Sequence, residues 1–231
     1  MNAGDLAAAA AFATLPPAWA AVLPGWTPKR LAAVRECIAA VSGDRPIAPD
    51  DPFRALRLVA PEAAKVVVIG QDPYPTAGHA DGLAFSAARG KPRSLARVFE
   101  VLASDRPGFV TPTVWSLDVW ARAGVLLLNP VLTVEIGRSA SHMFCGWQAL
   151  TSEIVRVLSE RADPPVFLLW GGKAKAFWAD TIAEGCRAPV HATRHPSYDF
   201  DRAFMAEGSQ FEATAHLVDW WAIGRVPGPV L

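Results

Sequence analysis

Four places in the sequence put side chains that can do chemistry at the end of a short apolar run. In order along the chain, these are Gly70-Gln71-Asp72-Pro73-Tyr74, Asn129-Pro130, Gly171-Gly172-Lys173 and Arg194-His195-Pro196-Ser197. An aspartate held on a tight turn can act as a general base or stabilise developing positive charge, and a histidine facing it can donate to a developing anion. An asparagine presents a donor and an acceptor side by side, which matches the edge of a nucleobase or an amide.

Flat and phosphate-binding groups accompany these polar residues. Tyr74 and Phe85 offer planar surfaces suited to a planar ligand. Backbone N–H groups and basic side chains suited to phosphates occur in Lys91-Pro92-Arg93-Ser94, Gly171-Gly172-Lys173 and His195-Pro196-Ser197. A planar base, a bond that cleaves with charge separation and a phosphate chain together indicate a nucleoside or nucleic-acid substrate.

A single carboxylate narrows the reaction class. A retaining glycosidase needs two close carboxylates, and Asp72 has only Asp81 as an obvious neighbour in the sequence. The chain also lacks GxSxG, GxxxxGK[ST] and HExxH. Cleavage of an N-glycosidic bond fits better, because the base leaves as a delocalised anion and needs less proton donation.

The elements that must position these residues alternate between apolar runs and helix-like stretches. The runs are Lys65–Ile69, Val125–Asn129, Val166–Trp170 and Val190–Thr193; the stretches are Ser94–Ala103, Val114–Ala123, Trp147–Glu160, Lys173–Glu184 and Phe211–Ile223. This order predicts an α/β fold, a three-layer α/β/α sandwich with a central, mainly parallel four-stranded sheet. Ligands gather at the carboxyl ends of the strands in such sheets, so we expect one shared site.

We expect a single domain over residues 1–231, with a mostly helical part at 1–60 and a catalytic core at 65–221. The segment KRLAAVRECIAAVSG has helical spacing and a stop at Gly43. The alanine-rich start is broken by Pro16-Pro17 and carries Asp5 upstream, so it is interpreted as a terminal helix or arm rather than a signal segment.

Composition sets further bounds on function. Lys plus Arg and Asp plus Glu both number 22, so the net charge is zero; this argues against nucleic-acid binding through global charge and leaves room for a local basic face. The three cysteines, Cys37, Cys145 and Cys186, are scattered. They predict reduced thiols in a cytoplasmic protein and give too few ligands for a four-cysteine metal site. We expect no metal and no cofactor.

Several motifs, in order along the chain, resemble those of the family 1 uracil-DNA glycosylases. The similarity runs from about Lys65 to Trp221 and rests on GQDPY (70–74), GLAFS (82–86), WARAGVLLLN (120–129), VLTV (131–134), SH with GW (141–147), LLWG (168–171) and HPS (195–197). A single one of these motifs would be weak support, but several in the right order are specific.

The resemblance implies a role for each residue that meets the base. Asp72 would position and activate water and stabilise the oxocarbenium-like sugar, and His195 would donate to uracil O2 as charge develops there. Asn129 would pair with the polar edge of uracil and reject cytosine. Phe85 would stack on the base, and Tyr74 would exclude the 5-methyl group of thymine.

The resemblance also implies contacts that hold DNA. Gln71 would contribute a backbone contact to uracil, while phosphates would be held and compressed so that the nucleotide flips out. The residues expected at the phosphates are Ser94, Gly172 and Ser197, and Pro196 is expected among the DNA contacts. The expected substrate is uracil-containing DNA, single- or double-stranded, bound by a monomer. A protein inhibitor that mimics DNA is a further candidate partner.

Three positions depart from the family pattern. Pro75 stands where the family usually has a histidine that supports the water-activating loop, so we expect activity to survive with a reduced rate. After His195-Pro196-Ser197, direct register puts Asp199 where the family has a leucine wedged into the DNA stack. Tyr198 or Phe200 could take the place of that wedge, or both could only pack the loop. Lys173 replaces a commoner serine and adds charge near a phosphate. His79 and Asp81 are expected to be solvated loop residues.

The leading hypothesis is therefore a uracil-DNA glycosylase that releases free uracil, leaves an abasic site and initiates base-excision repair. Two alternatives stay open. One is a protein that binds uracil-containing or abasic DNA with little turnover, which the altered loop and Pro75 motivate. The other is a glycosylase whose specificity has shifted towards another damaged base.

Overall fold

A four-stranded parallel sheet forms the centre of the computed structural model, which describes residues 10–182, 185–199 and 201–225. Its strands are β2 (Val66–Ile69), β3 (Val125–Leu128), β5 (Val166–Trp170) and β6 (Val190–Thr193), in the order β3-β2-β5-β6. Every residue of β2 and β3 is buried, as expected for apolar strands covered on both faces. The predicted sheet is confirmed.

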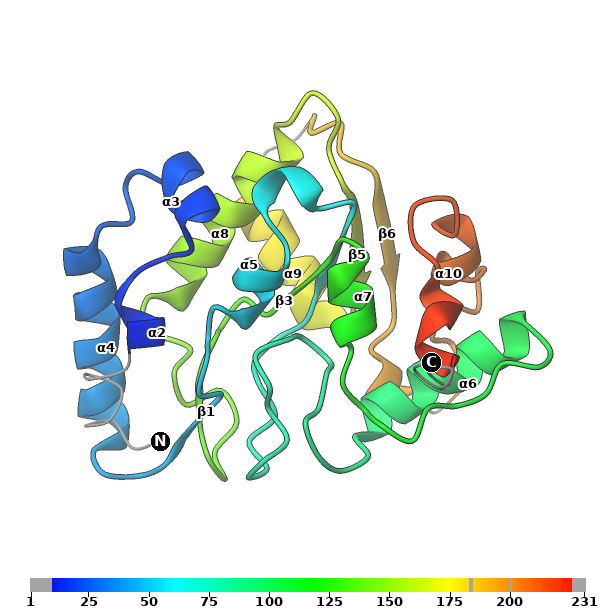
Figure 1. Ribbon diagram of the computed structural model, residues 1–231, viewed down its shortest axis with the longest axis horizontal. Coiled ribbons are helices and arrows are strands. Elements are labelled where there is room, and N and C mark those ends of the chain that lie inside the picture. Colours follow the sequence, from blue (N-terminus) through cyan, green and yellow to red (C-terminus); the bar gives the residue numbers. More distant parts are fainter. Residues whose placement is uncertain (1–9, 183–184, 200, 226–231) are drawn as a thin grey trace, which may run out of the picture.

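Helices lie on both faces of this sheet (Figure 1). The chain passes from β2 to β3 through α6 (Arg93–Asp105) and α7 (Asp118–Arg122), and it returns past β2 to β5 through α8 (Trp147–Ser159). From β5 it continues in that direction to β6 through α9 (Gly172–Thr181). Parallel crossovers are right-handed, so connections that run in opposite directions put their helices on opposite faces. The three-layer α/β/α arrangement is confirmed.

Residues 10–60 contain several helices. They form α2 (Ala10–Ala13), α3 (Pro17–Val22), α4 (Pro28–Ser42) and α5 (Arg54–Leu58), followed by a 3-10 turn, η1 (Pro61–Ala63). Helix α4 ends at Gly43, whose φ of 55° favours glycine. A short ladder that the sequence did not predict joins β1 (Ile47–Ala48) to β4 (Val134–Glu135). Residues 1–9, which begin the alanine-rich start, lie outside the described residues.

Two predicted helices were wrong in extent. Helix α7 covers only Asp118–Arg122, because the backbone N–H of Leu117 donates to Ser86 Oγ instead of entering a helix. The predicted helix Phe211–Ile223 is divided into α10 (Gln210–Ala213) and η3 (Trp220–Gly224). The break lets the indole N–H of Trp220 donate to Thr214 Oγ1 while both Trp220 and Trp221 are buried.

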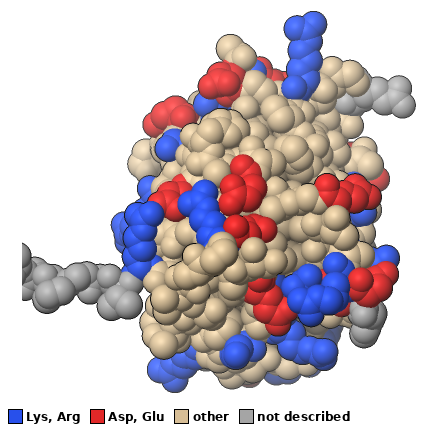
Figure 2. Space-filling model, turned by 90° about the vertical axis from the view of Figure 1, so that its right-hand side faces the viewer, with Lys and Arg blue, Asp and Glu red and all other residues tan. Residues whose placement is uncertain are grey.

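Charge is mixed on the outer face near β6, α6 and α10. In Figure 2, which shows this side, basic and acidic side chains lie next to one another over most of the face, and several basic side chains lie along its lower edge. No helix in the described ranges is long and apolar enough to cross a membrane.

Candidate active site

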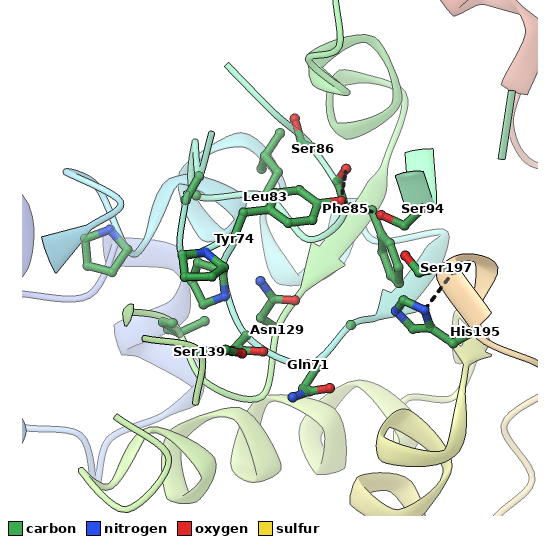
Figure 3. Close-up of a pocket in the computed structure, with 18 of the residues that line it drawn as sticks. Gln71, Tyr74, Leu83, Phe85, Ser86, Ser94, Asn129, Ser139, His195 and Ser197 are labelled. Carbon is green, nitrogen blue, oxygen red and sulfur yellow. Dashed lines mark hydrogen bonds between the residues drawn. The ribbon is translucent and has the colours of Figure 1, made fainter. Parts of the chain in front are cut away.

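A cavity of about 250 Å³ opens at the carboxyl ends of the parallel strands. Most of the side chains predicted from the sequence line it, together with Ser139, which was not predicted (Figure 3). The predicted residues that it brings together are Gln71, Asp72, Tyr74, Phe85, Ser94, Asn129, His195, Ser197 and Tyr198. These residues lie together at this edge of the sheet although Gln71 and Tyr198 are 127 positions apart (198 − 71), whereas Gly171-Gly172-Lys173 does not line the cavity.

The Asp72 carboxylate is held on one side only. Its Oδ2 atom accepts hydrogen bonds from Ser139 Oγ at 3.0 Å and from the backbone N–H of Ala140 at 2.7 Å. The N–H of Gly137 donates to the carbonyl of Pro75 at 2.8 Å, which joins the same segment to the turn after Tyr74. Within the described chain Oδ1 has no hydrogen-bond partner, so one oxygen is fixed and the other is left for water or substrate.

A buried hydrogen-bond chain fixes the segment that holds Asp72. Trp147 Nε1 donates to Thr133 Oγ1 at 2.8 Å, and since an indole N–H only donates, the Thr133 hydroxyl proton can go to His142 Nδ1 at 2.9 Å. His142 Nε2 then donates to Ser42 Oγ at 2.8 Å, and Ser42 donates to Glu135 at 3.2 Å. Burial lowers the pKa of His142 to about 4, so its imidazole is neutral and this direction of donation is maintained.

Asn129 presents a free amide to the cavity. The residue is 8% exposed, and among the described residues the amide has no hydrogen-bond partner, so its polar atoms remain open to the cavity. The amide lies directly against the backbone of Gly70, where an added Cβ would come within 2.2 Å of Asn129 Oδ1. A ligand that offers a matching donor and acceptor can therefore pair with both ends of this amide.

Tyr74 and Ser94 form one wall of the cavity. The Tyr74 hydroxyl donates to the carbonyl of Phe85 at 3.1 Å, so Ser94 must supply the proton in the 2.7 Å contact between the two hydroxyl groups. Burial raises the pKa of Tyr74 to about 12. The ring is thereby fixed, neutral and unable to turn away from a bound base.

Phe85 is held in a strained conformation beside His195. Its φ is 64°, which is unusual for a residue with a large side chain. The ring centroid lies 4.9 Å from that of Trp170 and 5.7 Å from that of His195. Strain of this kind persists only where the surrounding structure imposes it, and here it turns a ring face toward the ligand space.

Asp81 helps to impose that conformation, and the expectation that it is a solvated loop residue was wrong. Its side chain is 7% exposed and accepts from Ser86 Oγ at 2.6 Å, while it pairs with Arg54 at 3.0 Å. Burial raises its pKa against the opposing effect of Ser86 and Arg54. His79 is also partly buried, with its ring edge-on to Tyr74 at 6.2 Å. Both residues support the turn that carries Phe85.

His195 points one ring nitrogen into the cavity. Its Nδ1 accepts from the backbone N–H of Ser197 at 3.1 Å, so the neutral ring carries its proton on Nε2. Burial lowers the pKa of this imidazole. Gly171 lies behind the ring with φ 108°, and an added Cβ would come within 2.8 Å of His195 Cβ. The site thus offers an uncharged N–H donor.

The residues predicted to hold phosphate are placed in two different ways. Ser94 is buried with its hydroxyl engaged by Tyr74, so only its backbone could serve a phosphate. Gly172 and Lys173 begin α9 with both residues exposed, outside the cavity wall. Pro196 begins the segment that follows His195, called here the exit loop (residues 196–199 and 201–205), and is buried. Ser197, the next residue, lines the cavity.

The loop after His195 differs from the expected register. The 3-10 turn η2 (Pro196–Tyr198) leaves Tyr198 64% exposed at the rim, with its ring 5.5 Å from that of His195. Asp199, which direct register puts at a wedge position, instead turns inward, with a side chain only 3% exposed. Phe200 lies outside the described residues.

Together these groups can support one chemistry. A carboxylate with one free oxygen, a neutral imidazole N–H donor, an unpaired amide and a fixed aromatic wall surround a small cavity. Such a set can bind a planar heterocycle by its polar edge and stabilise it as an anion. It also presents a carboxylate to the carbon atom from which the heterocycle departs.

The comparisons with known proteins agree with this geometry. The family model described as uracil DNA glycosylase superfamily matches residues 57–220. The uracil-DNA glycosylase of human cytomegalovirus is 40% identical over 206 residues, which cover 83% of this chain and 81% of that protein. The uracil-DNA glycosylase of Albidiferax ferrireducens is 46% identical over 172 residues, 69% of each chain.

Solved structures show the same fold. The crystal structure of mimivirus uracil-DNA glycosylase is similar with a TM-score of 0.68 at 22% identity, and the alignment covers 86% of this chain and 72% of that one. A variant of the mimivirus protein, in complex with UGI, has the same TM-score and identity.

Proposed function

Because this chain belongs to the uracil DNA glycosylase superfamily, we propose that it hydrolyses the N-glycosidic bond of deoxyuridine in DNA. The products are free uracil and an abasic site, and the reaction initiates base-excision repair. The observation that carries this proposal is the amide of Asn129, which has no hydrogen-bond partner among the described residues and shares one cavity with Asp72, Tyr74 and His195.

The reaction divides between the two sides of the cavity. As the bond between C1′ and N1 breaks, its electron pair leaves with uracil, and the Nε2–H of His195 donates to the charge that develops on O2. The free oxygen of Asp72 faces the positive charge on the sugar and orients the water that adds to C1′. The proton of that water passes to the carboxylate, so no group has to protonate the base before it leaves.

Base selection follows from two fixed groups. Asn129 offers a donor and an acceptor to the polar edge of uracil, whereas cytosine presents its amino group where an acceptor is needed and leaves buried groups unpaired. Tyr74 is held by Ser94 and by the Phe85 carbonyl, so it cannot move aside for the 5-methyl group of thymine. Phe85 stacks on the base, and Gln71 contributes a backbone contact.

DNA is held outside the cavity by neutral and basic groups. Phosphates contact the exposed start of α9 at Gly172 and Lys173, the hydroxyl of Ser197 and the backbone of Ser94, while the buried Pro196 shapes the loop that carries Ser197. Compression between these contacts flips the nucleotide out of the stack. Tyr198, exposed at the rim, fills the space that the flipped nucleotide leaves, because aromatic side chains can serve as wedges between base steps.

The remaining attributes of the proposal concern the protein as a whole. One domain carries the activity, the protein acts as a monomer in the cytoplasm, and both single- and double-stranded DNA are substrates. A protein inhibitor that mimics DNA would compete at the same surface; the solved complex of a mimivirus uracil-DNA glycosylase variant with UGI motivates this part.

Incubation of the purified protein with oligonucleotides that contain one uracil tests the proposal. We expect an abasic product and free uracil from single-stranded and duplex DNA, and no release from matched oligonucleotides that contain thymine or cytosine in place of uracil. Binding of uracil-containing DNA without base release would instead indicate a binding protein. Release of another modified base in preference to uracil would indicate shifted specificity.

A further inference from the structure

The side chain of Asp199 joins the exit loop to helix α6, which packs beside it. Its Oδ2 accepts from Arg97 Nε at 2.5 Å, and the exposed fractions of the two side chains are 3% and 15%. Its Oδ1 accepts from the backbone N–H of Phe204 at 2.6 Å. Both carboxylate oxygens are therefore used inside the protein, and neither is available to DNA.

Helix α6 carries a second contact to the same loop one turn further on. Arg97 also donates to Glu100 at 3.1 Å, and Glu100 accepts from Arg202 at 3.4 Å. Acidic and basic side chains alternate in the series Asp199, Arg97, Glu100 and Arg202. The mixed charge near α6 in Figure 2 agrees with an outer face on which basic and acidic groups are paired.

The other end of the loop is fixed in the core. Phe204 is 1% exposed and packs edge-on against Trp170 with a centroid distance of 5.5 Å. The backbone N–H of Met205 donates to Thr193 Oγ1, at the end of β6, at 2.8 Å. Since Pro196 is buried before Tyr198 and the Asp199 side chain is buried after it, Tyr198 is left pointing outward.

Helix α6 also supports the cavity wall formed by Tyr74 and Ser94. Ser94, which binds the Tyr74 hydroxyl, and Arg97 are three residues apart, so both lie on the same face of the helix. One helix therefore supports the ring that faces the base and the loop that leaves the site. Removal of one member of a buried ion pair leaves the other uncompensated and is strongly unfavourable.

We propose that Arg97 and Asp199 form an ion pair that positions the exit loop, so that Tyr198 is presented to duplex DNA at a fixed place. Asp199 is thus a positioning residue and not a replacement wedge. Its pKa is consistent with this: burial raises it, but the hydrogen bonds from Arg97 and from the Phe204 N–H outweigh burial and hold it below its usual range.

The inference rests on the proposed function for its activity readout, and it predicts an effect that depends on the substrate. In duplex DNA the flipped nucleotide leaves a gap in the stack that Tyr198 must fill, whereas an unpaired strand is cheaper to unstack. Loss of the ion pair should therefore slow uracil release from duplex DNA much more than from single-stranded DNA.

The test compares Asp199→Asn with Asp201→Asn, the same chemical change two residues away. Asp201 pairs with Arg194 on the surface, where its side chain is 61% exposed. We expect Asp199→Asn to lower kcat/KM on duplex DNA by up to about tenfold, because the change acts through the placement of Tyr198 and cannot cost more than the loss of that ring. Single-stranded DNA should lose less than about threefold, and Asp201→Asn should change neither by more than about twofold.

Asp199→Leu gives the sharpest discrimination, because the two accounts predict opposite signs. If position 199 were the wedge, an apolar side chain would raise duplex activity. If Asp199 instead anchors the loop, the change breaks the ion pair and lowers the activity on duplex DNA. An increase, or no change, in duplex activity with Asp199→Leu would overturn the inference.

A second background separates positioning from a general loss of folding. With Tyr198→Ala already present, Asp199→Asn should lower kcat/KM on duplex DNA little further, because both changes remove the same ring from its place. If the losses in kcat/KM from the two changes simply add, the inference is contradicted. Fluorescence anisotropy of a duplex that contains an abasic site supplies a readout without turnover: Asp199→Asn should weaken binding and Asp201→Asn should not. A wild-type protein that releases no uracil would contradict the proposed function. The anisotropy measurement would still test the positioning role of Asp199, because it does not depend on uracil release.

Discussion

The cavity and the exit loop beside it reach their arrangement by different routes. Asp72, Asn129 and His195 each stand at the carboxyl end of a strand, so the direction of a parallel sheet is sufficient to bring them together. Tyr198 and Asp199 lie on a loop whose geometry depends on Arg97, 102 positions earlier. Function placed on strand ends can be recognised from local sequence, whereas function placed on a loop depends on its distant partner.

This contrast predicts that the two regions can be damaged separately. Changes in the cavity should slow release from every uracil-containing substrate, because the chemistry is the same in each. Changes in the loop should act mainly on duplex DNA. The predictions below run from the largest expected effect to the smallest.

The largest effect is expected from the carboxylate. Asp72→Asn keeps the shape of the side chain but removes the charge that faces the sugar and orients water. We expect a loss of about a thousandfold in kcat on single-stranded and duplex DNA alike. Single-turnover kinetics on both substrates measures this, and a loss confined to duplex DNA would contradict the division of roles.

Ser139, which also lies in the cavity, is expected to give a smaller loss of activity. Ser139→Ala removes one of the two hydrogen bonds to Asp72 Oδ2 and leaves the Ala140 N–H in place. A hydrogen bond to a charged group contributes enough to predict a loss of about tenfold in kcat with KM unchanged. Ser139→Thr, which keeps the hydroxyl, is the control and should recover most of the rate. A change in KM alone would assign Ser139 to DNA binding instead.

Tyr198→Ala tests the loop without disturbing the core, because the side chain is mostly exposed. We expect a loss of about tenfold in kcat/KM on duplex DNA, since the stacking of an aromatic side chain on a base contributes about 1–3 kcal/mol. Activity on single-stranded DNA should change by less than about threefold. Equal losses on both substrates would place Tyr198 in the chemistry.

Acid stability gives the most indirect prediction, because it concerns folding rather than uracil release. His142 is buried and neutral with its pKa lowered to about 4, so the unfolded chain binds a proton that the folded one refuses between about pH 6.5 and 4. The contribution of neutral His142 to the free energy of unfolding is fully present above pH 6.5. It is lost as the pH falls, by up to about 3 kcal/mol. His195 adds to the loss in the same direction, because burial lowers its pKa too.

Urea unfolding at pH 7 and pH 5 measures this effect. His142→Asn should be less stable than the wild-type protein at pH 7 but should show a flatter dependence on pH. An unchanged slope between the two pH values would contradict a neutral, buried His142.

Local patterns predicted most of the fold and much of the cavity. The four apolar runs became the four strands almost residue for residue, because short apolar runs bounded by turn residues have a simple signature, even though β6 is largely exposed. The predicted C-terminal helix failed since two neighbouring tryptophans, Trp220 and Trp221, are both buried and no local pattern shows how. The two-residue strands β1 and β4 are too short to have a period.

The missed site residues share one physical cause. Ser139 is a lone serine in an irregular segment, and only its nearness to Ser141-His142 could have pointed to it. Asp81 looks like a solvated loop residue until Arg54 and Ser86 are placed around it. Asp199 was aligned with a wedge position because direct register cannot show which way a side chain turns. Each role is set by a partner that lies far away in the sequence or within an irregular turn.

The ratio of duplex to single-stranded kcat/KM, measured for the wild-type protein, Ser139→Ala and Tyr198→Ala in one series, tests the central claim most directly. We predict that wild-type protein releases uracil from both substrates, that Ser139→Ala lowers both rates and leaves the ratio unchanged, and that Tyr198→Ala lowers the ratio. Ratios that move together in the two variants, or a wild-type protein that releases no uracil, would contradict the account.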